Sequence, residues 1–275
     1  MERMANNKII KVTGLMIYPV KSLAGISLQS SEVDAMGLKY DRRWMLVSPD
    51  GKFLSQRTLP RMALIKTALD AEGRLTLSMQ GKRDLAVPAE SDATLPVQIW
   101  NDQVEANLVS KTCDTWLSDA LGVACHLVYI ADDVVRQCDL AYAKQGDRTG
   151  FSDGFPMLLI SEASLQDLNE RMQARSVDPV EMRRFRPNIV VSGCEAFAED
   201  NWQNFTIANI PMRGVKPCSR CPIPTVNPDT GERTGTEPIA TLSTYRKQGA
   251  KVFFGMNVIQ QKTGELRLGD KLVVD

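Results

Sequence analysis

The sequence has very little histidine: His126 is the only one in 275 residues. A zinc site built from side chains needs four nitrogen or sulfur ligands, usually from two paired motifs, so zinc is poorly supported. The chain also has no excess charge, with 33 Lys and Arg against 33 Asp and Glu. Without a net positive field, neither nucleic acid nor an anionic membrane is an expected partner.

Long apolar runs are missing as well. No segment of about 18 apolar residues is present, and the N-terminal residues MERMANNKIIKVTGLMIYPV lack the features of a signal peptide. We therefore expect a cytoplasmic protein. Its six cysteines are irregularly spaced and do not suggest a disulfide framework. Four of them are isolated and are predicted to pack in the core: Cys113, Cys125, Cys138 and Cys194.

What is present is enough apolar material for a sizeable core, arranged mainly in strand patterns. Residues 9–109 form short alternating runs separated by turn signals such as Pro-Asp-Gly. One helix is predicted at 112–122, capped by Thr112 or Asp114 and ended by Gly122, and a second helix is predicted after a Ser161 cap. Strands return after residue 188. We predict an α+β, mainly antiparallel β protein in two parts, a β-barrel-like N-terminal domain (1–122) and a second barrel domain with a few helices (123–275).

A pair of cysteines, Cys218 and Cys221, lies in the segment VKPCSRCPIPTVNPDTGER (215–233). The prolines that follow Cys221 disfavour the regular helix that a thioredoxin-type redox pair requires. Neighbouring Lys216 and Arg220 would favour a thiolate, which is a soft metal ligand or a nucleophile. From these residues alone, incidental loop packing is an equally open interpretation.

Several polar residues at predicted strand ends could bind an anion. Arginine binds phosphate with two parallel hydrogen bonds, and lysine supplies a point charge. Each residue also has a structural interpretation, as a strand-end residue or, for Asp153, as a turn residue. The candidates are Lys21 and Ser22 in YPVKS, Arg42 and Arg43 in YDRRW, Asp153 in FSDGFP, and Arg186 and Asn188 in FRPN.

These segments occur together in an order that resembles one protein family. YPVKS, YDRRWMLV, FSDGFPMLLISEASLQDLN, FRPNIVVSG, EDNW and KPCSRCPIPTVNPDTG are similar to MOSC proteins with an N-terminal β-barrel domain, the group of the amidoxime-reducing components. The resemblance extends from about Thr13 to Leu272. It implies a molybdenum cofactor (molybdopterin with molybdenum) between two domains, and reduction of N-hydroxylated compounds such as amidoximes, hydroxylamines and N-hydroxylated bases. Pyridoxal phosphate is not expected.

The resemblance also implies roles for individual residues. Cys221 is the expected metal ligand, and Arg220 and Asp153 are expected beside it at the catalytic centre. The expected cofactor contacts are Lys21, Ser22 and Arg42 at the phosphate, and Arg186, Asn188, Ser219 and Arg220 elsewhere. Pro224 and Asn227 stand where relatives often carry other residues, so the resemblance says less about the surface that faces the substrate than about the metal ligand.

Electron supply separates this chain from the bacterial counterpart in that family, which carries a C-terminal iron–sulfur domain, whereas this sequence stops at Asp275. No cysteine follows Cys221, and a Gly-x-Gly-x-x-Gly nucleotide motif is absent. We therefore expect a separate electron-donor protein, either a flavin reductase or a ferredoxin-like protein. Two alternatives stay open: a sulfurtransferase with a persulfide on Cys221 and no metal turnover, and a non-catalytic binding module in which both cysteines are structural.

Overall fold

The structure is a computed structural model that describes residues 9–275. Strands dominate it, and its α-helices are α1 (Lys111–Leu121), α2 (Glu162–Gln173) and α3 (Ile239–Ser243). Almost all strand pairs are antiparallel, which confirms the predicted α+β, mainly antiparallel class. Across residues 9–275, no helix has the length and apolar character needed to cross a membrane.

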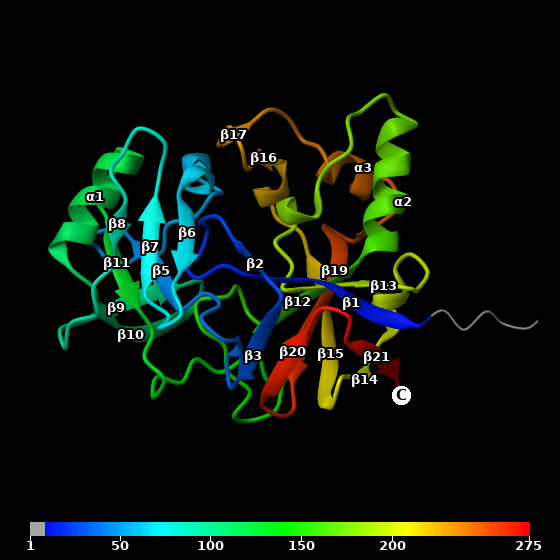
Figure 1. Cartoon of the computed structure of the whole chain (residues 1–275). Helices are drawn as coiled ribbons and strands as arrows, with labels where there is room; N and C mark the ends of the chain where they lie inside the picture. The colour runs from blue at the N-terminus through cyan, green and yellow to red at the C-terminus, as the bar shows by residue number, and fades with distance from the viewer. Residues whose placement is uncertain (1–8) are drawn as a thin grey trace, which may run out of the picture.

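Seven strands close into a barrel, seen on the right in Figure 1. Strands β12 and β13 are parallel neighbours, and β19 pairs with both β15 and β12, so the ring closes on itself. In order around the barrel the strands are β12 (Met157–Ser161), β13 (Ile189–Ser192), β1 (Ile10–Ile17), β21 (Lys271–Val274), β14 (Asn204–Ile207), β15 (Ile210–Ser219) and β19 (Lys251–Gln260). Two short strands extend it, β2 (Ile26–Leu28) beside β1 and β18 (Lys247–Gln248) beside β19.

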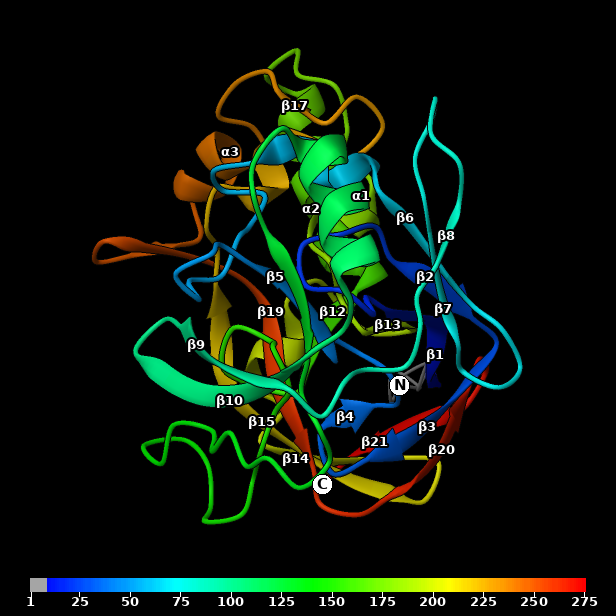
Figure 2. The same cartoon turned by 90° about the vertical axis from the view of Figure 1, so that its left-hand side faces the viewer.

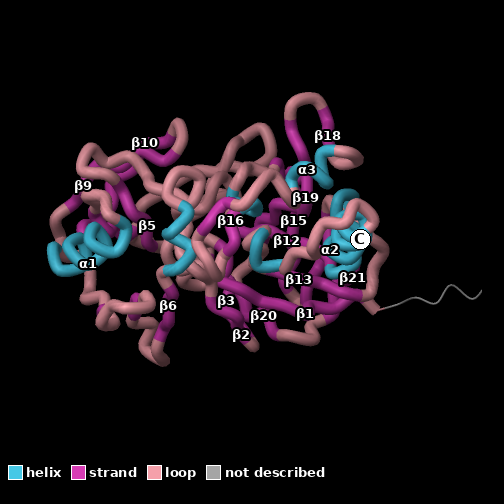
Figure 3. Tube along the Cα trace, turned by 90° about the horizontal axis from the view of Figure 1, so that it is seen from above, coloured by secondary structure: helices cyan, strands magenta, loops and turns pink. Residues whose placement is uncertain are grey.

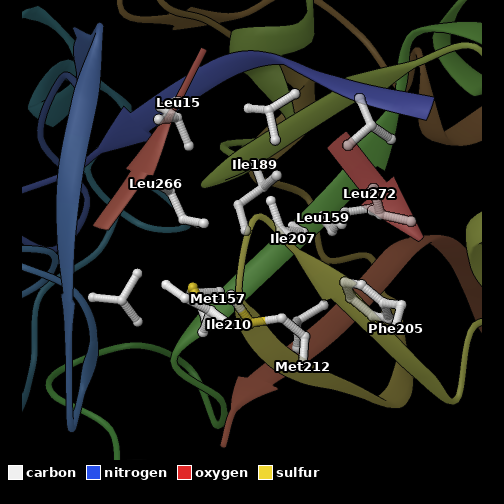
Figure 4. Packing of buried hydrophobic residues seen from close by; sticks show 14 of the residues in the cluster. Leu15, Met157, Leu159, Ile189, Phe205, Ile207, Ile210, Met212, Leu266 and Leu272 are labelled. Atoms are coloured by element: carbon white, nitrogen blue, oxygen red, sulfur yellow. The ribbon is translucent and has the colours of Figure 1, made fainter. Parts of the chain in front are cut away.

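The barrel is filled by apolar side chains from nearly every strand. Figure 4 shows Leu15, Leu159 and Ile189 packed with Phe205 and Met212. Alternate residues of a strand point to opposite faces, so the inward positions of these strands form one continuous core. This core fixes the strand ends from which the loops of the cavity described below project.

The other half of the molecule is a more open, half-barrel arrangement, seen on the left in Figure 1 and facing the viewer in Figure 2. Helix α1 packs against its sheet through Cys113, Leu117 and Leu121. Its main sheet has the order β5 (Trp44–Val47), β11 (His126–Tyr129), β10 (Asp102–Leu108) and β9 (Thr94–Ile99). A second sheet contains β6 (Lys66–Leu69), β7 (Leu75–Ser78) and β8 (Leu85–Ala86).

Short elements complete the fold, and the two halves lie side by side in Figure 3. One small sheet has the order β20 (Gly264–Arg267), β3 (Ser30–Asp34) and β4 (Gly37–Leu38), and another pairs β16 (Val226–Asn227) with β17 (Glu232–Arg233). The 3-10 turns are η1 (Pro60–Leu64), η2 (Met182–Arg184), η3 (Ala198–Asn201) and η4 (Ile223–Thr225). The domain boundary at residue 122 stays a prediction. Strand pairing does not follow it, because β1 is one of the barrel strands and the other six come from residues after 122.

The helix caps were predicted with mixed success. Ser161 caps α2 and Gly122 ends α1 with a left-handed φ of 73°, both as predicted. The predicted cap of α1 was wrong: Ser110 accepts from the Cys113 amide instead. Asp114 is engaged elsewhere, because its carboxylate bonds His126 Nδ1 at 2.7 Å and the Leu127 amide at 2.9 Å.

The isolated cysteines largely follow the packing prediction. Cys113, Cys125 and Cys138 are buried, and Cys194 is half-buried. All six cysteines are free thiols in the described chain.

Candidate active site

A cavity of about 120 Å³ lies where loops from both halves meet. It brings together the predicted site residues Lys21, Ser22, Arg42, Asp153, Arg186, Asn188, Ser219, Arg220 and Cys221. These residues lie near the ends of barrel strands: Lys21 and Ser22 follow β1, Asp153 precedes β12, and Asn188 precedes β13. Cys218 and Ser219 end β15, and Cys221 follows it. Arg43, the other anion-binding candidate, does not line the cavity, because its guanidinium bonds the Ile130 carbonyl at 2.8 Å and Asp132 at 2.6 Å. A rigid barrel that holds converging loops is a common way to build a functional site.

The backbone of the cavity is unusual at three of these residues. Ser22, Arg42 and Arg186 have positive φ angles of 68°, 48° and 58°. For residues other than glycine this left-handed region costs about 1 to 2 kcal/mol, and it persists where the surroundings impose it. The surrounding structure therefore imposes a strained backbone conformation on these three residues and holds their side chains at the cavity.

The inner end of the cavity is a hydrogen-bonded frame, which we call the inner frame: Asp41, Arg42, Arg186 and Asn188. Arg42 Nη1 donates to Asp41 Oδ2 at 2.6 Å and to Asn188 Oδ1 at 2.9 Å, and its Nη2 donates to the Arg186 carbonyl at 3.2 Å. Asn188 Nδ2 in turn donates to the Met16 carbonyl at 3.1 Å. Both terminal nitrogens of Arg42 are thus bonded to protein groups, and Asn188 connects the frame to β1 through Met16.

Tyr18 lies between the two arginines of the inner frame. Its ring centroid is 4.4 Å from the Arg42 guanidinium carbon and 4.1 Å from that of Arg186. Burial raises the pKa of Tyr18 to about 12 and lowers the pKa of Arg186 to about 10. Both groups keep their ordinary protonation state near neutral pH. Arg186 is therefore a half-buried cation, and its Nη1 donates to the Leu23 carbonyl at 2.7 Å.

The other end of the cavity, which we call the outer end, contains Lys21, Arg57, Trp100, Asp153 and Cys221. Asp153 Oδ1 bonds Lys21 Nζ at 2.6 Å and Asp153 Oδ2 bonds Arg57 Nη2 at 2.7 Å. Lost hydration raises the pKa of Asp153, but the two cations outweigh this effect and hold it well below its usual range. Burial lowers the pKa of Lys21 to about 8 against the attraction of Asp153. The Asp153 side chain is 54% exposed, so this end of the cavity opens to water.

The two cysteines of the loop differ in their surroundings. Cys218 packs against the cluster that contains Leu158 and Phe254, and its sulfur accepts from Arg220 Nη1 at 3.1 Å. Burial raises the pKa of the Cys218 thiol, although Arg220 opposes the shift. Cys221 belongs to no apolar cluster of the described residues and lines the cavity near Arg57. Both thiols are half-buried and line the cavity, and the role of Cys221 as a metal ligand stays a prediction.

A molybdenum cofactor carries a phosphate and two dithiolene sulfurs, so its site must supply several donors for anionic atoms. Four buried guanidinium nitrogens around this cavity have no partner among the described residues: Arg57 Nε and Nη1, Arg186 Nη2 and Arg220 Nε. An unsatisfied buried N–H costs about 1 to 3 kcal/mol, so such groups favour an anionic ligand. Nowhere in residues 9–275 do three or more His, Cys, Asp or Glu side chains gather to hold a metal. A metal at Cys221 would thus need ligands from a cofactor, and the residues present fit that cofactor.

Sequence reasoning missed Arg57 and Trp100 at the outer end. Arg57 follows no predicted strand end, and Trp100 lies in a hairpin turn, so neither position carried a signal.

A larger groove of about 870 Å³ adjoins the cavity at Arg186 and Ile223. Its walls come from both halves of the molecule and include Lys66 and Arg184.

Each half of the chain matches a known domain family. Residues 9–124 match the MOSC N-terminal beta barrel domain, and residues 146–273 match the MOSC domain. The chain is 34% identical to mouse mitochondrial amidoxime-reducing component 1 and 33% identical to the human protein, over 94% of this chain and 80% and 81% of theirs. It is also 32% identical to a molybdenum cofactor sulfurase of Oryza sativa, over 90% of this chain but 32% of that protein.

Proposed function

This chain belongs to the family of MOSC proteins with an N-terminal MOSC β-barrel domain, and on that premise we propose that it is a molybdenum-dependent reductase of N-hydroxylated compounds. The relatives named as amidoxime-reducing components match over 94% of this chain and about 80% of their own length. The observation that carries the proposal is one cavity that holds Cys221 together with four unpartnered guanidinium nitrogens. The cytoplasm remains the expected compartment.

The reaction is a two-electron reduction that breaks an N–O bond. An N-hydroxylated compound R–NH–OH takes up two electrons and two protons and gives R–NH₂ and water. When bound, the molybdenum cofactor would supply two-electron redox chemistry with exchange of an oxygen atom. We propose that the electrons come from a separate flavin-containing or iron–sulfur protein.

The chain's own residues would hold and orient the reactants. Cys221 would be the thiolate ligand, because soft sulfur ligands suit a soft, redox-active metal. Arg186 and Arg220 would donate to anionic atoms of the cofactor through the nitrogens that lack a protein partner. Arg42 and Asn188 would keep Arg186 in place, and Lys21 would hold Asp153 at the outer end.

Sulfur transfer is the second candidate, because the chain also aligns with part of a molybdenum cofactor sulfurase. In that case Cys221 would carry a persulfide and no metal. The two functions predict different contents of the purified protein. The reductase carries about one molybdenum per chain, whereas the sulfur carrier has sulfane sulfur that cyanide releases.

A turnover experiment tests the reductase directly. Protein loaded with cofactor in a competent host should reduce benzamidoxime to benzamidine with reduced methyl viologen under anaerobic conditions. It should not react with NADH or NADPH alone, because no flavin or iron–sulfur relay is predicted in the sequence. Loaded protein that fails with viologen would overturn the proposed activity, and turnover with NADH alone would overturn the need for a separate donor.

A further inference from the structure

Arg57 reaches the cavity from the half-barrel side of the molecule. It lies in the loop between β5 and η1, and its guanidinium stacks on Trp100 at 4.5 Å from the ring centroid. Its Nη2 donates to Asp153 Oδ2 at 2.7 Å. Two contacts of different kind, an aromatic face and a carboxylate, therefore fix the guanidinium in one orientation.

Two N–H donors of the Arg57 guanidinium are not used by these contacts. Arg57 Nε and Nη1 are buried and have no partner within residues 9–275. Arg136, a buried arginine beside the same loop, shows the contrast: its nitrogens bond the Asp102 carboxylate and the carbonyls of Gly150, Ser152 and Asp153. Arg136 has a complete structural role, whereas Arg57 is held in place by one nitrogen and presents two others to the cavity.

The position of these donors distinguishes Arg57 from the other cations of the site. Arg186 lies at the inner frame against Tyr18, whereas Arg57 lies at the outer end against Trp100, which is 43% exposed. Arg57 and Cys221 line the same cavity, and the Asp153 carboxylate that Arg57 bonds is 54% exposed, so this is the end of the cavity that a substrate can enter.

We infer that Arg57 is a substrate-binding residue that holds the N-hydroxyl oxygen next to Cys221 through Nε and Nη1. The inference rests on the proposed reductase function. Oxygen gains negative charge as the N–O bond breaks, and two fixed N–H donors stabilise that charge without reorganising. Arginine stays protonated, so Arg57 supplies charge and orientation while the two protons of the reaction come from solvent.

Three variants of the loaded enzyme test this role. Arg57→Gln removes the charge, and Arg57→Lys keeps a charge that can pair with Asp153 but lacks the forked donors. Arg233→Gln is the matched control, because Arg233 is exposed and lies outside the cavity, and its side chain donates to the Arg57 carbonyl at 3.0 Å without reaching the guanidinium. For each protein we would measure molybdenum and pterin content, kcat and KM for benzamidoxime with reduced viologen, and the molybdenum(V) EPR spectrum with and without benzamidoxime.

The inference requires normal metal and pterin content in Arg57→Gln, with kcat/KM lowered by about 100-fold, the effect typical of losing one preorganised donor. Arg57→Lys should recover part of this loss, and Arg233→Gln should match wild type. Benzamidoxime should change the EPR spectrum of wild type and not that of Arg57→Gln.

Each other result overturns the inference. Loss of molybdenum or pterin from both Arg57 variants would assign Arg57 to cofactor binding. Unchanged kcat/KM in Arg57→Gln, with an active wild type, would overturn the role of Arg57 alone. A loaded wild type that does not reduce benzamidoxime would overturn the proposed function and this inference together.

Discussion

Arg42 in the inner frame and Arg57 at the outer end of the cavity use their guanidinium groups in different ways. In the inner frame, Arg42 is bonded to Asp41, Asn188 and the Arg186 carbonyl. At the outer end, Arg57 is bonded to Asp153 and keeps two buried nitrogens without partners in the described structure. An arginine whose terminal nitrogens are bonded to the protein stabilises the fold, whereas one that keeps buried nitrogens without partners favours a ligand.

The largest expected effect comes from the cysteine loop at the outer end. Cys221→Ser should lose more than about 100-fold in molybdenum affinity or turnover, because changes to outer-shell residues alone cost about 10- to 100-fold. Cys218→Ser is the matched control and should keep most of both, since Cys218 packs against the barrel-side core. Metal analysis and viologen-driven turnover measure the two effects. Equal losses in both variants would contradict a single-thiolate site.

Breaking the inner frame should instead cost stability. Asp41→Asn removes the charge that pairs with Arg42 at 2.6 Å in a buried position, and breaking one partner of such a pair costs about 3 kcal/mol or more. We expect a lower free energy of unfolding in urea and a lower cofactor content. Asp50→Asn, which alters an exposed pair with Lys52, should leave unfolding unchanged. An Asp41→Asn protein as stable as wild type would show that the frame is not structural.

The smallest effect concerns the pH dependence of Lys21, which joins Asp153 to the barrel. The folded pKa of Lys21 is about 8, below the usual 10.5, so the unfolded chain binds more protons between these values. Stability from this group therefore rises as pH rises through 8. Compared with Lys21→Met, wild type should gain about 2 kcal/mol in unfolding free energy between pH 7 and 9.5. Urea unfolding at several pH values measures this, and parallel pH profiles would show that burial does not disfavour the Lys21 charge.

Local pattern was a good guide to the elements and a poorer guide to their ends. The Ser161 cap and the Gly122 end followed from residue type and spacing, because both depend on groups within one helical turn. The cap of α1 was misassigned because Asp114 is used by His126 and Leu127, which a local rule does not place nearby. The same limit applies to Arg57, whose partners Trp100 and Asp153 are far from it in the chain.

The sequence by itself determined the fold class, the family resemblance and the candidate residues of one site, because these depend on residue types and on their order along the chain. Only the tertiary structure decided which groups of those residues are hydrogen-bonded to the protein and which are available to a ligand. It closed the barrel with β1 between β13 and β21 and bonded Arg42 into the inner frame. It also left two Arg57 nitrogens, Nε and Nη1, without a partner among the described residues. The physical reason is that a hydrogen bond depends on distance and direction in space, and packing of the whole chain sets both.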